Sequence, residues 1–336
     1  MNEMSSFQRI SRERGVELAT KILARAGYSD DHASIMIENM VEAQAQECHS
    51  HGLYRLIDCT KVANAGLVNL TAVPVVTDHA VSVVKVDAGG GNSLLAFKKG
   101  LGLLSEKAKA NGIAALAINN SFHYSALWWE VELISELGLV ALAMSPTMPF
   151  VAPYGGIKPL LGTNPMAFSW PRPGGEPCTF DFATSAAARG EVEIRRRRGE
   201  TLPPEWAIDN EGNPTTDAER AMSGALLPFG KHKGSAISIM VELLAGPMIG
   251  DLLSHQTGQV NNTENKGLVH GELIIAIDPD RFGVSVDAAE GLFQEIVGQG
   301  ARLPSQRRRT ASKRSQSDGL LISSELLVEL TQLCDG

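Results

Sequence analysis

One short segment, residues 50–55, holds the residue types that proton transfer and anion binding need. An imidazole has an unperturbed pKa of ~6.5, so His51 can donate a proton at neutral pH, and the hydroxyl of Ser50 stands beside it. Arg55 follows about one helical turn later, where its guanidinium could hold a carboxylate through two hydrogen bonds. The spacing alone equally fits a serine that caps a helix beside a surface histidine and a surface arginine.

Two other patterns suggest ligand sites and are weaker. Cys48 and His49 stand close to His51, but no second pair of metal ligands follows at a recognisable spacing, so we expect no metal site. The glycines at 89–91 precede an expected helix, but Leu94 stands where a dinucleotide-binding fingerprint has its third glycine. A Rossmann domain is therefore not expected.

Hydrophobic periodicity divides the chain into three parts: a helical part at 1–72, a sheet domain at 73–220 and a helical C-terminal part at 221–336. The expected helices are 7–26, one from about 30 toward 48, one from about 53, 94–110, 125–137 and 235–246, and the expected strands are 73–76, 81–86, 113–118, 139–144 and 273–277. Residues 146–171 are rich in proline and glycine and predict loops or short strands. The polar stretch 256–266 predicts a mobile insertion. The segment 230–234, with lysines and a histidine between glycines, fits either a phosphate site before a helix or a plain basic loop.

The composition is that of an ordinary globular protein, with 336 residues, 43% of them hydrophobic, and a formal net charge of −8. The acidic balance argues against nucleic acid as a partner, because such binding needs a basic surface. Residues 1–14 lack the apolar core of a signal peptide, and no apolar run approaches the ~18 residues of a membrane span. The four cysteines form no CxxC pair, which favours a reduced, cytoplasmic protein without a membrane partner.

Several motifs together resemble those of the malate/L-lactate dehydrogenase family, which binds nicotinamide cofactors without a Rossmann fold. They are, in chain order, Ser50-His51-Gly52-x-x-Arg55 and the segments 161–165 (Leu-Gly-Thr-Asn-Pro), 181–185 (Asp-Phe-Ala-Thr-Ser), 202–203 (Leu-Pro), 227–230 (Leu-Pro-Phe-Gly) and 232–234 (His-Lys-Gly). Within the family, segments 123–128, 226–235 and 302–308 are most similar to the Δ1-piperideine-2-carboxylate/Δ1-pyrroline-2-carboxylate reductases.

The resemblance implies a mixed α/β fold of the non-Rossmann malate/L-lactate dehydrogenase type, with a largely antiparallel NADPH-binding sheet, placed at 73–220, beside helical parts. It also implies a homodimer that uses NADPH, with NADH as the other option, on a small-molecule substrate. The expected reaction is reduction of a cyclic 2-imino carboxylate to L-proline or L-pipecolate. The alternative within the family is an NAD(P)-dependent 2-hydroxyacid dehydrogenase of the malate, lactate or ureidoglycolate type. A rival outside the enzymes is a binding protein whose cofactor site has decayed.

The resemblance further assigns roles to individual residues. His51 becomes the proton donor, Ser50 its relay partner, and Arg55 and Thr163 contacts to the substrate. The cofactor contacts that it implies are His123, Tyr124, Ser125, Ala126, Leu127, Asp181, Phe182, Ala183, His232, Lys233, Arg302, Pro304, Ser305, Arg307 and Arg308. Among these, Arg307 and Arg308 are the candidates for the adenosine 2′-phosphate, a dianion that a guanidinium holds well.

The chain departs from the reductases at one motif, where they typically read His-Gly-Asp and this chain reads Arg189-Gly190-Glu191. Glu191 stands in the place of the acidic relay residue, so the resemblance puts that role on it, with Asp181 as the second candidate. The plainer alternative for Glu191 is an ordinary surface acid. Arg189 and Gly190 fall in the substrate pocket, and an arginine at this position is found in hydroxyacid dehydrogenases, which keeps the alternative reaction open.

Overall fold

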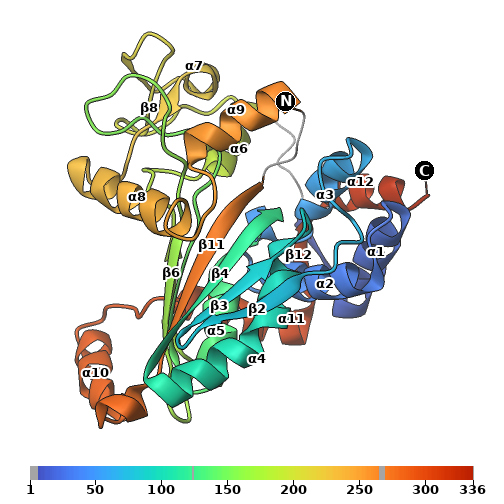
Figure 1. Cartoon of the computed structure of the whole chain (residues 1–336). Coiled ribbons are helices and arrows are strands. Elements are labelled where there is room, and N and C mark those ends of the chain that lie inside the picture. Colours follow the sequence, from blue (N-terminus) through green and yellow to red (C-terminus); the bar gives the residue numbers. More distant parts are fainter. Residues whose placement is uncertain (1–6, 123–124, 265–268, 336) are drawn as a thin grey trace.

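A seven-stranded sheet forms the centre of the structure, a computed structural model that describes residues 7–122, 125–264 and 269–335 (Figure 1). Its strands, in spatial order, are β2 (Val75–Ala80), β3 (Val83–Asp87), β4 (Ile113–Phe122), β11 (Val269–Ile277), β5 (Val140–Met144), β6 (Met166–Trp170) and β7 (Cys178–Phe182). Every neighbouring pair is antiparallel except β3 with β4, which are parallel. This mixed, mostly antiparallel sheet confirms the predicted fold class and differs from the parallel sheet of a Rossmann domain.

The central strands were visible in the sequence because they are short apolar runs rich in aliphatic and β-branched residues. The predicted strands at 81–86, 113–118, 139–144 and 273–277 correspond to β3, β4, β5 and β11. Most residues of β5 and β11 are buried, as expected for strands in the middle of a sheet that is covered on one face and partly covered on the other.

Two helices, α4 (Ser93–Asn111) and α5 (Trp128–Glu136), pack against one face of the sheet. The side chain of Asn92 caps α4 by accepting a hydrogen bond of 2.9 Å from the backbone N–H of Leu94, and Gly112, with a φ of 86°, ends the helix. The fully buried Phe97 and Leu104 fill the core between α4 and the sheet. The helix predicted at 94–110 is confirmed, and the one predicted at 125–137 begins three residues later, at Trp128.

The N-terminal part is a layer of three helices, α1 (Arg12–Arg25), α2 (Asp30–Ala45) and α3 (Arg55–Asn64), with the short 3-10 helix η1 (His49–His51) before α3. The prediction of a helix from residue 7 is wrong at its start. Phe7–Ile10 form β1, which pairs antiparallel with β12 (Leu320–Ser323), and Ser11 then caps α1 by accepting from the Arg14 N–H at 3.1 Å. The partner of β1 lies at the other end of the sequence, so no local pattern indicates the pairing.

A small lobe, residues 189–264, stands at one end of the large sheet (Figure 1). It consists of α6 (Arg189–Arg197), β8 (Ala207–Ile208), β9 (Pro214–Thr215), α7 (Ala218–Ser223), β10 (Ala225–Leu226), α8 (His232–Ala245) and α9 (Ser254–Glu264). The expected mobile insertion at 256–266 is wrong for its described residues, because they belong to α9. Ser254 and Thr257 are buried, so packing against the neighbouring segments makes a helix of this polar sequence.

The segments that follow β11 lie in two different places in the structure. After β11, the 3-10 turns η2 (Pro279–Phe282) and η3 (Val286–Ala289) and helix α10 (Glu290–Gly298) stand at the end of the sheet opposite the small lobe (Figure 1). Helices α11 (Gln306–Asp318) and α12 (Ser324–Asp335) then return to pack on α2 and α1. No helix in the described ranges is long and apolar enough to cross a membrane.

Candidate active site

The Ser50-His51-Gly52 segment forms a tight turn between α2 and α3, at η1. The Oγ of Ser50 lies 3.1 Å from Nδ1 of His51, so the predicted relay pair is in hydrogen-bond contact. Gln44 holds the turn, since its Nε2 lies 3.1 Å from Nδ1 of His49 and its Oε1 accepts from the N–H of Leu53 at 3.0 Å. A Cβ on Gly52 would lie 2.3 Å from Gln44 Oε1 and 3.1 Å from its Cα. The glycine of the motif is therefore required by the close approach of Gln44.

Arg55, the first residue of α3, shapes the electrostatics of this turn. Its guanidinium forms an ion pair of 3.1 Å with Asp58, one turn along the same helix. Burial, and after it the positive charge of Arg55, lowers the pKa of His51 to about 3. In the absence of a ligand the imidazole is therefore neutral at pH 7. An anion bound beside Arg55 would offset this charge and raise the pKa of His51.

Thr163 lies in a separate, densely hydrogen-bonded segment. Its N–H donates to Thr147 Oγ1 at 2.9 Å, and the two hydroxyl oxygens are 3.0 Å apart. Its carbonyl accepts from the N–H of Thr184 at 2.8 Å, which joins the predicted substrate segment 161–165 to the predicted cofactor segment 181–185.

The Arg189-Gly190-Glu191 motif opens helix α6. The guanidinium of Arg189 lies 3.7 Å from the centre of the Phe150 ring, and burial lowers its pKa. Phe150 and Thr147 belong to the same loop, so Arg189 and Thr163 lie on neighbouring parts of the structure. Glu191 accepts from Arg195 at 3.0 Å, one helical turn along. Among the described residues it makes no hydrogen bond or ion pair with His51.

Asp181, the second candidate for the acidic role, lies at the end of β7 and faces the start of α5. Its Oδ2 accepts from the Trp128 N–H at 3.0 Å, and burial raises its pKa to about 6, although this hydrogen bond and the charge of Arg308 lower it. Of the predicted cofactor segment before α5, Ser125, Ala126 and Leu127 are buried; His123 and Tyr124 lie outside the described residues.

Stacked phenylalanines join the remaining cofactor motifs. Phe182, 39% exposed, stacks on Phe180 at 5.2 Å and meets the edge of Phe229 at 5.7 Å, while Ala183 follows it in the chain. His232 and Lys233 form the first turn of α8, where Lys233 is exposed and the His232 ring lies 6.1 Å from that of Tyr154. The segments 181–185 and 227–234 are thus neighbours, as one shared site requires.

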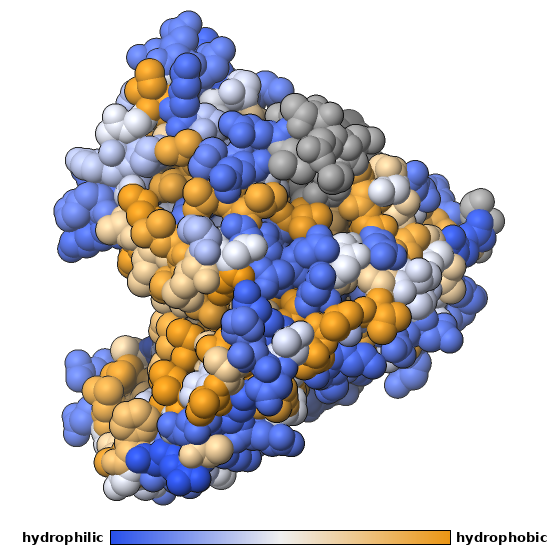
Figure 2. Space-filling model, viewed as in Figure 1, coloured by the Kyte–Doolittle hydropathy of each residue, from blue (hydrophilic) through white to orange (hydrophobic). Residues whose placement is uncertain are grey.

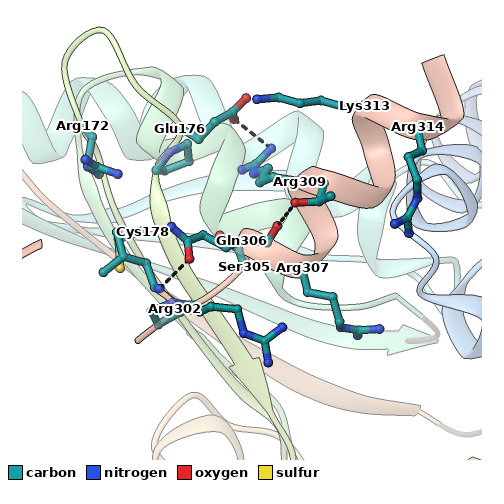
Figure 3. Close-up of a pocket in the computed structure, with 14 residues that line it drawn as sticks. Arg172, Glu176, Cys178, Arg302, Ser305, Gln306, Arg307, Arg309, Lys313 and Arg314 are labelled. Carbon is teal, nitrogen blue, oxygen red and sulfur yellow. Dashed lines mark hydrogen bonds and ion pairs between the residues drawn. The ribbon is translucent and has the colours of Figure 1, made fainter. Parts of the chain in front are cut away.

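A pocket of about 590 Å³ lies where the loop before α11 meets the hairpin of β6 and β7 (Figure 3). Its lining residues are Arg172, Glu176, Pro177, Cys178, Arg302, Leu303, Pro304, Ser305, Gln306, Arg307, Arg309, Thr310, Lys313 and Arg314. Arg309 pairs with Glu132 at 2.7 Å and with Glu176 at 3.2 Å. Within the described part of the chain, Arg302, Arg307 and Lys313 form no ion pair, so the pocket has an excess of positive charge.

The two arginines expected at the 2′-phosphate have different surroundings. Arg307 lines the pocket, whereas Arg308 is buried beside it. Arg308 donates to Gln46 Oε1 at 2.6 Å and to Glu132 Oε1 at 3.0 Å, and it lies 4.4 Å from the centre of the Trp128 ring. Arg308 thereby ties α11 to α2 and α5.

The cationic pocket is also a neighbour of the histidine turn. Burial lowers the pKa of His49, Glu47 raises it, and the charge of Arg307 lowers it. The charges of Arg308 and Arg307 likewise act on the Cys48 thiol, whose pKa burial raises. The structure therefore gathers the turn at 48–52, the start of α11 and the start of α5. No hydrogen bond or ion pair among the described residues joins His51 to Thr163 or Arg189.

Sequence reasoning missed several residues that build the site. Gln44 and Gln46 carry no chemical signature in the sequence, and their importance follows from contacts with segments far along the chain. Arg309 and Lys313 stand one helical turn apart in a basic stretch, and that spacing could have indicated a cationic face of a helix. In the described ranges, no group of three or more His, Cys, Asp or Glu side chains could hold a metal ion.

The structure thus combines a mixed sheet without the Rossmann topology, a hydrogen-bonded Ser-His pair and a cationic pocket. The sequence profile of the malate/L-lactate dehydrogenases matches residues 10–331. The chain belongs to this family of oxidoreductases, as the resemblance implied. Membership also means that its cofactor is a nicotinamide nucleotide.

Individual relatives cover almost the whole chain. It is 50% identical to the Δ1-pyrroline-2-carboxylate/Δ1-piperideine-2-carboxylate reductase of Pseudomonas aeruginosa, over 95% of this chain and 97% of the relative. It is 47% identical to the Δ1-pyrroline-2-carboxylate reductase of Pseudomonas fluorescens, over 98% and 100%. The crystal structure of Δ1-piperideine-2-carboxylate reductase from Pseudomonas syringae pv. tomato superposes with a TM-score of 0.92 at 41% identity, over 97% of this chain and 99% of that one.

Proposed function

We propose that the protein reduces a cyclic 2-imino carboxylate, Δ1-pyrroline-2-carboxylate or Δ1-piperideine-2-carboxylate, to L-proline or L-pipecolate, with NADPH as the reductant. The observation that carries this proposal is the near-full-length identity of about half with relatives that bear these substrates in their names. The hydrogen-bonded Ser50 and His51, with Arg55 beside them, supply the proton and carboxylate chemistry that such a reaction needs.

In the proposed mechanism, the hydride that reduces C2 of the substrate would come from NADPH when it is bound. Arg55 binds the substrate carboxylate and orients C2, and Thr163, Arg189 and Gly190 complete the substrate site. The bound carboxylate offsets the charge of Arg55, so the pKa of His51 rises from its low value and the imidazole can carry the proton that goes to the ring nitrogen. Ser50 relays that proton.

An acidic group would keep the histidine oriented, and Glu191 and Asp181 both stay candidates for this role. Glu191 is held by Arg195 on its own helix, and Asp181 is held by the backbone of Trp128. A movement of α6, or the approach of a second subunit, would be needed to bring Glu191 to His51. Asp181 acts on Cys48 electrostatically, which supports its nearness to the histidine turn.

The pocket beside α11 suits the phosphate-bearing end of NADPH. Arg302, Arg307 and Lys313 are cations that line it without an acidic partner in the described ranges, and a phosphate dianion would neutralise them. Arg307 is the better of the two candidates for the 2′-phosphate, because the charge of Arg308 is already engaged by Glu132 and its face by Trp128. The remaining contacts would come from the segments predicted for them: Ser125, Ala126 and Leu127; Asp181, Phe182 and Ala183; His232 and Lys233; Pro304 and Ser305.

The proposal includes a homodimer located in the cytoplasm. Figure 2 shows apolar side chains along the hollow between the end that carries α8 and the end that carries α10. Ile239, Leu243 and Met248, on and just after α8, are 44%, 54% and 58% exposed, which would favour burial against a second copy. All four cysteines are free thiols, as a reducing compartment would keep them.

A second candidate function, oxidation or reduction of a 2-hydroxy or 2-keto acid, is favoured by one observation. Arg189 replaces the histidine of the reductases, and its half-buried guanidinium on Phe150 would suit a substrate with an additional oxygen substituent. The two reactions need the same hydride and the same proton, and they differ in the atom that receives the proton.

The test is a side-by-side assay in which the purified protein oxidises NADPH or NADH with each cyclic imine, and with pyruvate, oxaloacetate and glyoxylate. We expect the highest kcat/KM with a cyclic imine and NADPH. A kcat/KM for a 2-keto acid tenfold above that for both imines would replace the proposed reaction with the second candidate. Lack of turnover together with lack of NADPH binding would indicate the decayed binding protein.

A further inference from the structure

Glu242, a residue of α8 that no motif singles out, lies buried behind the Thr163 segment. It is 5% exposed, and its carboxylate accepts three hydrogen bonds. Oε1 accepts from the N–H of Gly162 at 3.3 Å and from Nδ2 of Asn164 at 2.8 Å, and Oε2 accepts from the N–H of Ser254 at 2.8 Å. An ionised carboxylate is an acceptor only, so it matches three converging donors, whereas a side-chain amide would turn at least one N–H against another donor.

The carboxylate acts on Thr163 through Asn164. Asn164 is fully buried and holds an unusual backbone φ of 37°, which the hydrogen bonds of its side chain support. Its Nδ2 donates to Glu242 and to Ser238 Oγ at 2.9 Å, while its Oδ1 accepts from the N–H of Thr147 at 3.1 Å. Because Thr147 in turn accepts from the N–H of Thr163 and lies 3.0 Å from its hydroxyl, the position of that hydroxyl depends on Glu242.

The second oxygen of Glu242 fixes the start of α9. Ser254 is the first residue of that helix, and a carboxylate at a helix N-terminus is favourable both as an acceptor and for the helix dipole. α9 packs on the loop that carries Thr147 and Phe150, since a Cβ on Gly258 would lie 2.9 Å from Pro149. Glu242, on α8, therefore connects the Gly162–Asn164 segment to the start of α9, which packs on the loop with Thr147.

The geometry points to Glu242 as a positioning residue for substrate binding: it orients the Thr163 hydroxyl through Asn164 and Thr147 and holds α9 against the same loop. The inference rests on the proposed function, because that proposal puts Thr163 in contact with the substrate. Glu242 itself touches neither substrate nor cofactor, so its effect should fall on KM for the imine and spare the affinity for NADPH.

The test uses the full-length protein and the variants Glu242→Gln, Asn164→Asp and the double exchange Glu242→Gln with Asn164→Asp. Each single change places two similar groups in contact. In Glu242→Gln an amide N–H faces another donor, and in Asn164→Asp two carboxylates face each other. The double exchange restores one amide and one carboxylate with their places swapped. We expect each single variant to raise the imine KM about tenfold, with kcat within about threefold of the wild type. The double exchange should recover only part of the loss, because the N–H of Gly162 then faces an amide N–H at position 242.

Two further variants separate positioning from general stability. Asp209→Asn removes a buried carboxylate that accepts from the N–H groups of Glu211 and Asn213 in the same lobe, and it should lower Tm without changing KM. Thr147→Val breaks the link to Thr163 without touching Glu242, so it gives the same rise in KM even where Glu242→Gln does not fold.

Amide hydrogen exchange gives a readout that does not depend on catalysis. In Glu242→Gln, peptides that contain Gly162, Thr163 and Ser254 should exchange faster than in the wild type, while peptides of the large sheet should not change. A wild-type KM in Glu242→Gln and Thr147→Val, or faster exchange spread over the whole lobe as in Asp209→Asn, would overturn the inference. A wild type that turns over no imine defeats the proposed function instead, and the exchange pattern then decides by itself whether Glu242 anchors Thr163.

Discussion

Arg55, the first residue of α3, follows His51, the last residue of η1, and its positive charge acts together with burial to hold the pKa of that imidazole at about 3. The same arginine is paired with Asp58, so the charge is fixed in place. At neutral pH the imidazole of His51 is therefore unprotonated, and a bound anion would be needed to raise its pKa. In the proposed mechanism, proton donation by His51 is thereby linked to binding of the substrate carboxylate at Arg55.

Arg55→Gln should raise the pKa of His51, because it removes the positive charge and leaves only burial to lower that pKa. NMR titration of the histidine side chains in both proteins measures the change. The same variant should raise KM for the substrate with a smaller effect on kcat, since the carboxylate loses its partner. An unchanged KM would remove Arg55 from the substrate site.

His51→Ala should lower kcat by roughly 10²–10⁴-fold, the usual contribution of a general acid, and leave NADPH binding intact. Steady-state kinetics and quenching of protein fluorescence by NADPH measure the two effects. His49→Ala is the matched control, because it removes a histidine from the same turn that contacts Gln44 and not Ser50. Near-normal turnover in His51→Ala would show that another group supplies the proton.

Arg307→Ala and Arg308→Ala should affect different properties: the first should lower the affinity for NADPH, and the second should lower the stability of the fold. Removal of Arg307 from the pocket should weaken NADPH binding by roughly 10–100-fold, since a hydrogen bond to a charged group contributes about 1.5–3 kcal/mol, and leave NADH binding unchanged. Removal of Arg308 should instead cost about 3 kcal/mol of stability, because Glu132 and Gln46 lose a buried partner. Titration with NADPH and NADH measures the change in affinity, and urea unfolding measures the change in stability. Equal losses of NADPH and NADH affinity in Arg307→Ala would contradict a 2′-phosphate contact.

Stability should fall as pH rises from about 4.5 to about 8, because two buried carboxyl groups, Glu130 of α5 and Glu272 of β11, lie next to each other. Burial raises the pKa of Glu272 to about 8 from an ordinary value of 4.5, and burial and the neighbouring Glu272 raise that of Glu130. Between pH 4.5 and 8 the folded protein therefore holds more protons than the unfolded chain, so stability is complete below this window and is lost as pH rises through it.

Glu272→Gln mimics the protonated acid and should flatten this dependence, with a higher Tm than the wild type at pH 9 and little difference at pH 5. Thermal unfolding at a series of pH values measures the effect. Parallel curves for the two proteins would mean that Glu272 is not protonated in the folded state.

Local patterns in the sequence were sufficient for the parts of the fold that depend on local periodicity. The helix at 94–110 and the strands at 113–118 and 139–144 follow from the spacing and clustering of apolar residues. The set of motifs, in their order along the chain, was sufficient to identify the family. Local patterns failed where a distant segment decides the structure: β1 is a strand because β12 pairs with it, and α9 is a helix because buried contacts hold a polar sequence.

The candidate site divides in the same way. Ser50, His51 and Arg55 could be selected from residue types and spacing, because only a few types of side chain donate protons or bind carboxylates. Gln44 and Glu242 could not, since they act through geometry that only the folded chain provides. The difference between Arg307 and Arg308, adjacent and chemically identical, appears only when their neighbours are known.

Part of the support of the histidine turn comes from β12, a segment far along the chain. Gln44, which braces that turn, also donates to the carbonyl of Leu321, and β1 is completed by the strand that contains Leu321. During translation Gln44 and His51 leave the ribosome well before Leu321, which lies 277 residues after Gln44. The contacts that Gln44 and β1 make with β12 can therefore form only after that strand has been synthesised and has docked.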